Sequence, residues 1–221
     1  MKAKKLYPII LLSLLLGVSV GFNIAHIVEG GHPKVERVEA DSSKSTVKQV
    51  NKSKTAATNG DDPKMVPLDE FTYKDSSETK AYPILKDHPE AYIDVDIAKQ
   101  RTYIKDGNKT LYEMYASTGE KDATPRGTYQ IEPEHGEYFY TAPLKLGAYH
   151  WVSFLNHGEY LFHSTPTDEN GNYVESIAKT LGVKPSSHGC VHLSNPDLQW
   201  LYNNVQPGMK VVIHGTFDKT K

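Results

Sequence analysis

The stretch Tyr92-Ile93-Asp94-Val95-Asp96-Ile97 alternates apolar and polar side chains with a period of two residues. This alternation predicts a β-strand that buries one of its faces. Two more strand-like runs follow at 101–104 and 111–115, with the turn Lys105-Asp106-Gly107-Asn108 between them. Asp-Gly between two such runs indicates a β-hairpin, because glycine readily adopts the positive φ that a tight hairpin turn requires. The sequence therefore predicts a domain that begins with a strand and a hairpin.

Short strands dominate the rest of the domain as well. Further strands are predicted at 127–131, 138–141, 150–154, 161–163 and 209–214. Two short helices are predicted, one at 174–181 that ends before Gly182, and one at 196–205 that begins after a cap at Ser194 or Asn195. We therefore expect a mainly β fold, a sandwich or partly closed barrel with one or two short helices.

The first 28 residues indicate a membrane anchor. Lys2, Lys4 and Lys5 precede a largely apolar run at 6–28, and about 20 apolar residues suffice to span a bilayer. We expect residues 1–28 to be an uncleaved signal-anchor that crosses the cell membrane once, with the lysines inside and the rest of the chain outside. A cleaved signal, which would release the protein to the cell wall, is the alternative.

Residues 29–80 differ in composition from the rest of the chain. They are rich in charged and small polar residues, and no Phe, Trp or Tyr occurs in them before Phe71. Such a stretch buries too little apolar surface to offset the entropy lost on ordering, so we expect a flexible, disordered extracytoplasmic linker at 29–80. Both tryptophans and thirteen of the fourteen tyrosines lie beyond residue 70. The folded domain is therefore placed at 81–221, with its core at 90–215.

Cys190 is the only cysteine of the chain, and it lies in Ser187-His188-Gly189-Cys190-Val191-His192. A single cysteine excludes a disulfide within the chain and any metal site built from several thiolates. Gly189 gives the backbone freedom to bring N–H groups close to a substrate, as an oxyanion hole requires. The nearby histidines are expected to lower the thiol pKa and make thiolate available near neutral pH. We therefore expect a cysteine nucleophile; a buried inert thiol and an intermolecular disulfide are the alternatives.

Two histidines are candidates for the base that deprotonates this thiol. His188 lies two residues before Cys190, whereas His163 closes the predicted strand at 161–163. The residues alone leave this choice open. A metal site is a further alternative, because His188, Cys190 and His192 at every second position would share one face of a strand. His163 would then be a fourth ligand.

Phe162-His163-Ser164 followed by Ser187-His188-Gly189-Cys190-Val191 resembles the signature of the L,D-transpeptidases, the YkuD-like catalytic domain. Ser117-Thr118-Gly119 and Thr124-Pro125-Arg126-Gly127-Thr128-Tyr129 resemble a second stretch of that family. Two features depart from its pattern. The segment at 166–184 lengthens the spacing within the signature, and we expect it to be a lid-like insertion. His192 stands where many members of the family carry Arg or Asn.

The resemblance implies an enzyme that acts on peptidoglycan stem peptides. Cys190 would be the nucleophile, His163 would donate and accept protons, and the backbone of Ser164 would orient His163. The backbone amides of His188, Gly189 and Cys190 would bind the oxyanion. A thioester forms with release of D-Ala, and an amine of a second stem resolves it into a 3→3 cross-link. L,D-carboxypeptidase activity and attachment of proteins to the wall use the same chemistry and are alternatives, as is a non-catalytic wall-binding module.

Four further residues are expected to bind substrate: Ser187, His192, Trp151 and Tyr149. No cofactor and no metal are expected. The expected partners are peptidoglycan stem peptides and, through the N-terminal helix, the membrane. The formal net charge of −2 argues against nucleic acid, because it provides no strong basic field.

Overall fold

A computed structural model of the chain describes residues 64–220. The predicted signal-anchor at 1–28 and the linker up to residue 63 lie outside the described residues. Between residues 64 and 220, no helix has the length and apolar character that crossing a membrane needs.

The described residues form a mainly β domain, as predicted, with nine strands in one sheet. The strands are β1 (Ala91–Asp96), β2 (Arg101–Asp106), β3 (Lys109–Ser117), β4 (Gly127–Gln130), β5 (His135–Thr141), β6 (Leu146–Leu155), β7 (Tyr160–Ser164), β8 (Val191–Leu193) and β9 (Lys210–His214). They lie in the order β4-β9-β1-β2-β3-β8-β7-β6-β5. Two short helices, α1 (Glu175–Ala178) and α2 (Asn195–Asn204), and two 3₁₀ turns, Leu85–Asp87 and Glu120–Asp122, complete the domain.

Local signals in the sequence explain several of these elements. The predicted hairpin joins β2 to β3, and Gly107 in its turn has a φ of +56°. Ser194 is the N-cap of α2, and its Oγ accepts a hydrogen bond from the N–H of Asp197. The sequence does not predict β8, because three residues are too few to show a period of two.

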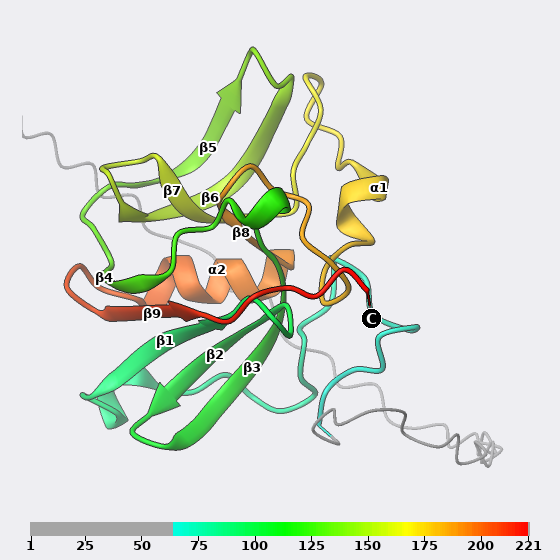
Figure 1. Ribbon diagram of the computed structural model, residues 1–221. Helices are drawn as coiled ribbons and strands as arrows, with labels where there is room; N and C mark the ends of the chain where they lie inside the picture. The colour runs from blue at the N-terminus through cyan, green and yellow to red at the C-terminus, as the bar shows by residue number, and fades with distance from the viewer. Residues whose placement is uncertain (1–63, 221) are drawn as a thin grey trace, which may run out of the picture. The chain divides into compact units, whose positions relative to one another are not determined.

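The long strand β3 makes the sheet continuous. Its residues up to Tyr115 pair with β2, whereas Ala116 and Ser117 pair with β8. The sheet therefore curls into a partly closed barrel instead of separating into the two sheets of a sandwich. Figure 1 shows α2 between the half that contains β1–β3 and the half that contains β5–β7.

The hydrophobic core lies where α2 meets the two halves of the sheet. It is built from buried side chains of distant strands, among them Ile93 and Val95 of β1, Phe154 of β6, Phe162 of β7, and Leu198 and Leu201 of α2. The rings of Phe154 and Phe162 lie 5.0 Å apart between their centroids. Because the core holds β7 from one side, the residues of β7 that face away from the core have fixed positions.

Residues 64–80, which the sequence analysis assigns to the linker, are packed against the domain in the structure. Met65 and Tyr73 are buried in a small cluster with Tyr115, and Ser77 and Glu78 are buried as well. Composition does not reveal this packing, because hydrogen bonds to distant residues contribute much of it. The Ser77 hydroxyl, for example, accepts the N–H of Tyr115 in β3.

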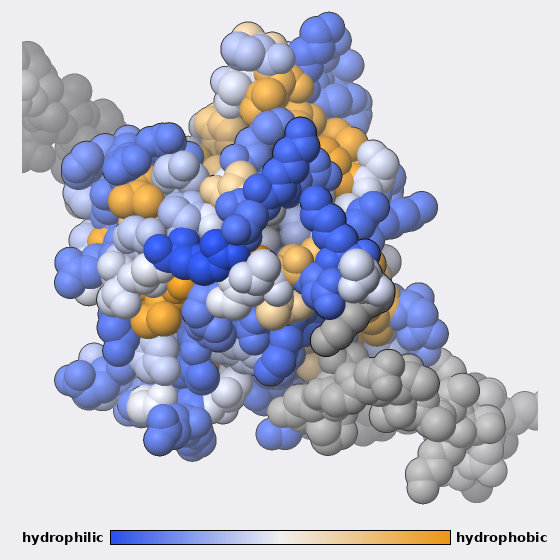
Figure 2. Space-filling view, in the orientation of Figure 1, coloured by the Kyte–Doolittle hydropathy of each residue, from blue (hydrophilic) through white to orange (hydrophobic). Residues whose placement is uncertain are grey.

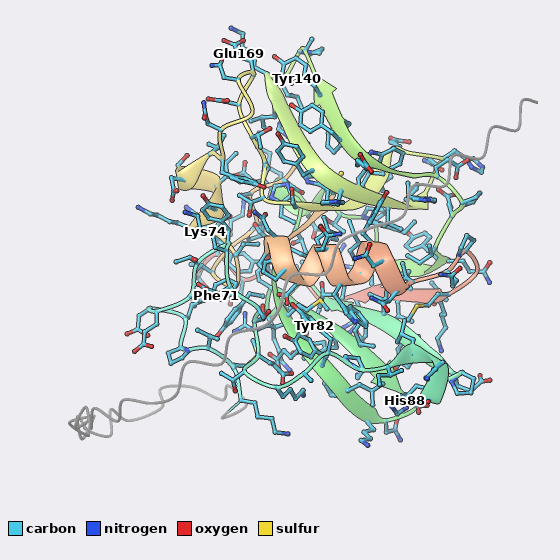
Figure 3. The ribbon with its side chains drawn as sticks, turned by 180° about the vertical axis from the view of Figure 1, so that it is seen from behind. Phe71, Lys74, Tyr82, His88, Tyr140 and Glu169 are labelled. Carbon is cyan, nitrogen blue, oxygen red and sulfur yellow. The ribbon has the colours of Figure 1, made fainter. Side chains whose placement is uncertain are left out.

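A buried carboxylate on α2 anchors this segment. Asp197 accepts hydrogen bonds from the Ser77 hydroxyl at 2.5 Å and from the Tyr82 hydroxyl at 2.6 Å. The Tyr82 ring stacks on Tyr112 and on Trp200, so it lies between β3 and α2 (Figure 3). Burial raises the pKa of Asp197 to about 6. The segment before β1 is thus tied to the helix that covers the core.

We predict that Asp197→Ala lowers the free energy of unfolding by about 2–4 kcal/mol, because the buried Ser77 hydroxyl and the half-buried Tyr82 hydroxyl lose their acceptor. Urea denaturation measures this change. The matched control Asp69→Ala removes an exposed carboxylate and should change stability by less than about 0.5 kcal/mol. Equal effects of the two substitutions would contradict the anchoring role.

Candidate active site

A cavity of about 410 Å³ lies among the β5–β6 hairpin, β7 and the loop before β8. Residues of the predicted site line it, namely Trp151, His163, Ser187, His188, Gly189, Cys190 and His192. Apolar side chains line the cavity as well, among them Phe139, Leu144 and Leu146. Figure 2 shows hydrophobic side chains exposed at the end of the molecule that carries this hairpin, where Leu144 is 44% exposed.

Strand pairing explains why residues far apart in sequence meet in this cavity. β7 and β8 are parallel, and His163 pairs with His192 in their register. On the other side of β7, His163 pairs with Trp151 of β6. Directly paired residues project to the same face of a sheet, so these three side chains line one wall. Cys190 immediately precedes β8, and its Sγ lies 3.9 Å from the Glu159 carbonyl oxygen.

His163 has a defined tautomer. Its Nδ1 lies 2.8 Å from the carbonyl oxygen of Ser164, and a carbonyl only accepts, so Nδ1 carries the proton and Nε2 has a free lone pair. The Ser164 hydroxyl is engaged elsewhere, since it accepts the N–H of Tyr149 and donates to the Thr165 carbonyl. Ser164 therefore holds His163 through its backbone, which is the contact that the family resemblance implies.

Desolvation favours the neutral forms of Cys190 and His163. Desolvation raises the pKa of the Cys190 thiol to about 11 and lowers the pKa of His163 to about 4. This differs from the expectation that nearby histidines make thiolate available near neutral pH. The reason is that a neutral imidazole provides no positive charge to stabilise a thiolate, while burial penalises the charged form of either group.

The loop before Cys190 is held by its own hydrogen bonds. Gly189 has a φ of +146°, and a Cβ at this position would lie 2.9 Å from the Tyr160 ring. The N–H of Gly189 donates to Ser187 Oγ at 3.0 Å, and the Ser187 hydroxyl donates to the Cys190 carbonyl at 2.6 Å. The Gly189 amide was expected to bind an oxyanion, but here it is already paired. Ser187 therefore shapes the loop from within.

Thr124 is a supporting residue that the sequence reasoning did not single out. Its hydroxyl accepts the N–H of Gly119 at 2.7 Å and donates to the Gly189 carbonyl at 2.9 Å. The feature of the sequence that could have indicated Thr124 is its position at the start of the 124–129 stretch, which resembles the family. Thr124 joins the loop after β3 to the loop that carries Cys190.

The inserted segment at 166–184 contributes to the cavity wall, as a lid-like insertion would. Pro166 and Ile177 line the cavity, and α1 belongs to this segment. The insertion is attached to the sheet, because the backbones of Thr167 and Gly147 exchange two hydrogen bonds.

Tyr149 lies outside the cavity, in contrast to the expectation that it binds substrate there. Its ring packs against those of Tyr138 and Tyr173, with centroids 4.9 Å and 6.1 Å away. Tyr149 is only two positions from Trp151 in β6, but it pairs with Tyr138 of β5. Its ring packs against the neighbouring tyrosine rings and therefore does not line the cavity.

The alternative of a metal site at His188, Cys190 and His192 is not supported by the geometry. Within residues 64–220, the three metal-ligating side chains whose donor atoms lie within 4.8 Å of one another are Glu132, Glu134 and His157. The donor atoms of His188, Cys190 and His192 do not form such a group. The side chain of His188 is exposed, whereas that of His192 is buried.

We predict that iodoacetamide alkylates Cys190 more slowly than a free cysteine at about pH 7, with a rate that rises toward about pH 11, because burial keeps the thiol protonated. Mass spectrometry over a pH series measures the rate. His163→Gln should leave this profile unchanged, since His163 is already neutral above about pH 5. Rapid alkylation near pH 6 that depends on His163 would contradict a neutral pair.

The sequence of this chain is similar to those of known proteins. The family model of the YkuD L,D-transpeptidase catalytic domain matches residues 90–213. YciB of Bacillus subtilis (strain 168), to which L,D-transpeptidase activity is ascribed, is 44% identical over 136 residues, which cover 60% of this chain and 69% of YciB.

Solved structures are similar at lower identity. An L,D-transpeptidase from Mycobacterium smegmatis is 23% identical with a TM-score of 0.47, over 57% of this chain and 58% of that chain. An L,D-transpeptidase from Stackebrandtia nassauensis is 20% identical with a TM-score of 0.45, over 68% of this chain and 63% of that chain. The match thus spans less than two thirds of each of these two solved chains.

Proposed function

Because this chain belongs to the YkuD family of L,D-transpeptidase catalytic domains, we propose that it forms 3→3 cross-links between peptidoglycan stem peptides through a thioester on Cys190. The observation that carries this proposal is the shared cavity of Cys190 and His163, whose Nε2 has a free lone pair. Hydrolysis of the same thioester, which is L,D-carboxypeptidase activity, and attachment of a protein amine to the wall are variants of this chemistry.

Acylation begins when a stem peptide places the carbonyl of its third residue next to Cys190. Sγ attacks the carbonyl carbon while the thiol proton moves to Nε2 of His163. The backbone amides of His188 and Cys190 bind the oxyanion, in a loop that Ser187 and Thr124 hold in place. The C–N bond then breaks, His163 returns the proton to the departing nitrogen, and D-Ala leaves as an amine.

Resolution reverses these proton movements. The amine of a second stem attacks the thioester carbon, the C–S bond breaks, and one amine proton passes through Nε2 of His163 to the Cys190 thiolate. The hydrogen bond from Nδ1 to the Ser164 carbonyl supports this role, because it orients the ring and stabilises the imidazolium that forms in each step.

We predict that Cys190→Ala abolishes D-Ala release and cross-linking, and that Cys190→Ser is nearly inactive, because a serine hydroxyl needs a stronger base. His163→Gln should lower turnover roughly 10²–10⁴-fold. Chromatography of muropeptides measures both products. The control His135→Gln changes an exposed histidine outside the cavity and should keep wild-type turnover.

A covalent probe tests the nucleophile independently of the peptide substrate. A bicyclic β-lactam should add its mass to the intact wild-type protein and leave Cys190→Ala unmodified. An adduct on Cys190→Ala, or cross-linking by that variant, would show that another group carries the chemistry.

We further propose that residues 1–28 anchor the protein in the cell membrane with the catalytic domain outside. The basic start, the apolar run at 6–28 and the polar composition of the next segment support this arrangement. Protease added to intact protoplasts should then remove the domain, as detected by immunoblotting. A domain that stays protected until the membrane is opened would contradict this topology.

A further inference from the structure

His192 is a second buried imidazole in the cavity, and the mechanism above does not use it. It is 4% exposed, lines the cavity, and its ring centroid lies 4.6 Å from that of His163. Burial, together with the neighbouring His163 and His188, holds the pKa of His192 well below its ordinary value. The ring is therefore neutral, with a proton on one nitrogen and a lone pair on the other.

A cluster of three hydroxyls lies behind this ring. Ser186 Oγ lies 2.8 Å from Ser117 Oγ and 2.7 Å from Thr180 Oγ1. Ser117 donates to the carbonyl of Lys184 at 2.7 Å, and Thr180 donates to the carbonyl of Ile177 at 2.6 Å. Carbonyls only accept, so the contact with Lys184 uses the proton of Ser117. Thr180 is the donor toward Ser186 as well. The contact between Ser117 and Ser186 therefore needs the proton of Ser186.

This count of protons sets the tautomer of His192. Its Nδ1 lies 3.5 Å from Ser186 Oγ. Ser186 has no proton left to donate to the ring, so Nδ1 carries the proton and donates it to Ser186. Nε2 of His192 keeps its lone pair, and among the described residues it has no hydrogen-bond partner. The cavity thus contains two neighbouring imidazoles, His163 and His192, that both have a bare Nε2.

We propose that Nε2 of His192 accepts the N–H of the reacting substrate nitrogen, and so directs the lone pair of that nitrogen. A bare imidazole nitrogen can accept a hydrogen bond, and the reacting nitrogen must already approach the adjacent His163 to exchange a proton. During resolution, one amine hydrogen goes to His163 and the other stays on nitrogen, bonded to His192, as the amide forms. During acylation, the N–H of the scissile amide makes the same contact. This inference rests on the proposed transpeptidase function.

Three substitutions distinguish the role of Nε2 of His192 from that of Nδ1. His192→Gln keeps an acceptor near the position of Nε2, His192→Asn keeps a polar group only near Nδ1, and His192→Phe keeps the ring without either. Turnover of a stem tetrapeptide that ends in D-Ala should fall roughly 10- to 100-fold in the Asn and Phe variants. The Gln variant should retain most of the wild-type kcat. If the Phe variant does not fold, the comparison of Gln with Asn still decides.

Acylation by a bicyclic β-lactam is the matched readout, because its ring nitrogen carries no hydrogen for His192 to accept. The rate of adduct formation on Cys190 should be unchanged in all three variants, and His135→Phe should change neither readout. Equal losses in both readouts would overturn the proposal and indicate that His192 acts through His163 or the fold. Unchanged peptide turnover in the Asn and Phe variants would also overturn it. A wild-type protein that forms no adduct would instead refute the proposed function, and the inference with it.

Discussion

The parallel pairing of β7 with β8 is the contact on which the rest of the site depends. It sets His163 beside His192 and brings the end of the loop with Cys190 to the same cavity. β8 has three residues, too few to fix its own register firmly. Two further contacts hold it in place. β3 pairs with its other edge, and the Thr124 hydroxyl binds the loop that precedes it. Small changes in these contacts would therefore move Cys190 relative to His163.

Burial determines the electrostatic state of this site. An exposed thiol and imidazole would titrate at ordinary values, but here desolvation moves the pKa of Cys190 up and that of His163 down. Under the proposed function, the proton would stay on sulfur until a bound substrate offers a carbonyl carbon for the sulfur to attack. In the proposed mechanism, activation of Cys190 is therefore coupled to substrate binding.

Local signals predicted the elements whose folding depends on neighbouring residues in sequence. Asp106-Gly107 predicted the hairpin and Ser194 the start of α2, because a turn and a cap are defined within a few residues. The signature predicted that Cys190 and His163 belong to one site, and both line the cavity. Proton states and amide partners could not be predicted in this way, since the pKa of Cys190 depends on burial by the whole fold.

The order of strands in the sheet has a consequence for how the domain folds. β1 pairs in parallel with β9, so that Ile93 lies beside Val211. The first strand of the sheet therefore lacks one of its neighbours until the last strand has been synthesised. Pairing of segments so far apart in the sequence is entropically costly and slow, so the sheet is completed only after β9 has been synthesised. A chain cut before β9 would leave β1 as an open edge, able to pair with another copy.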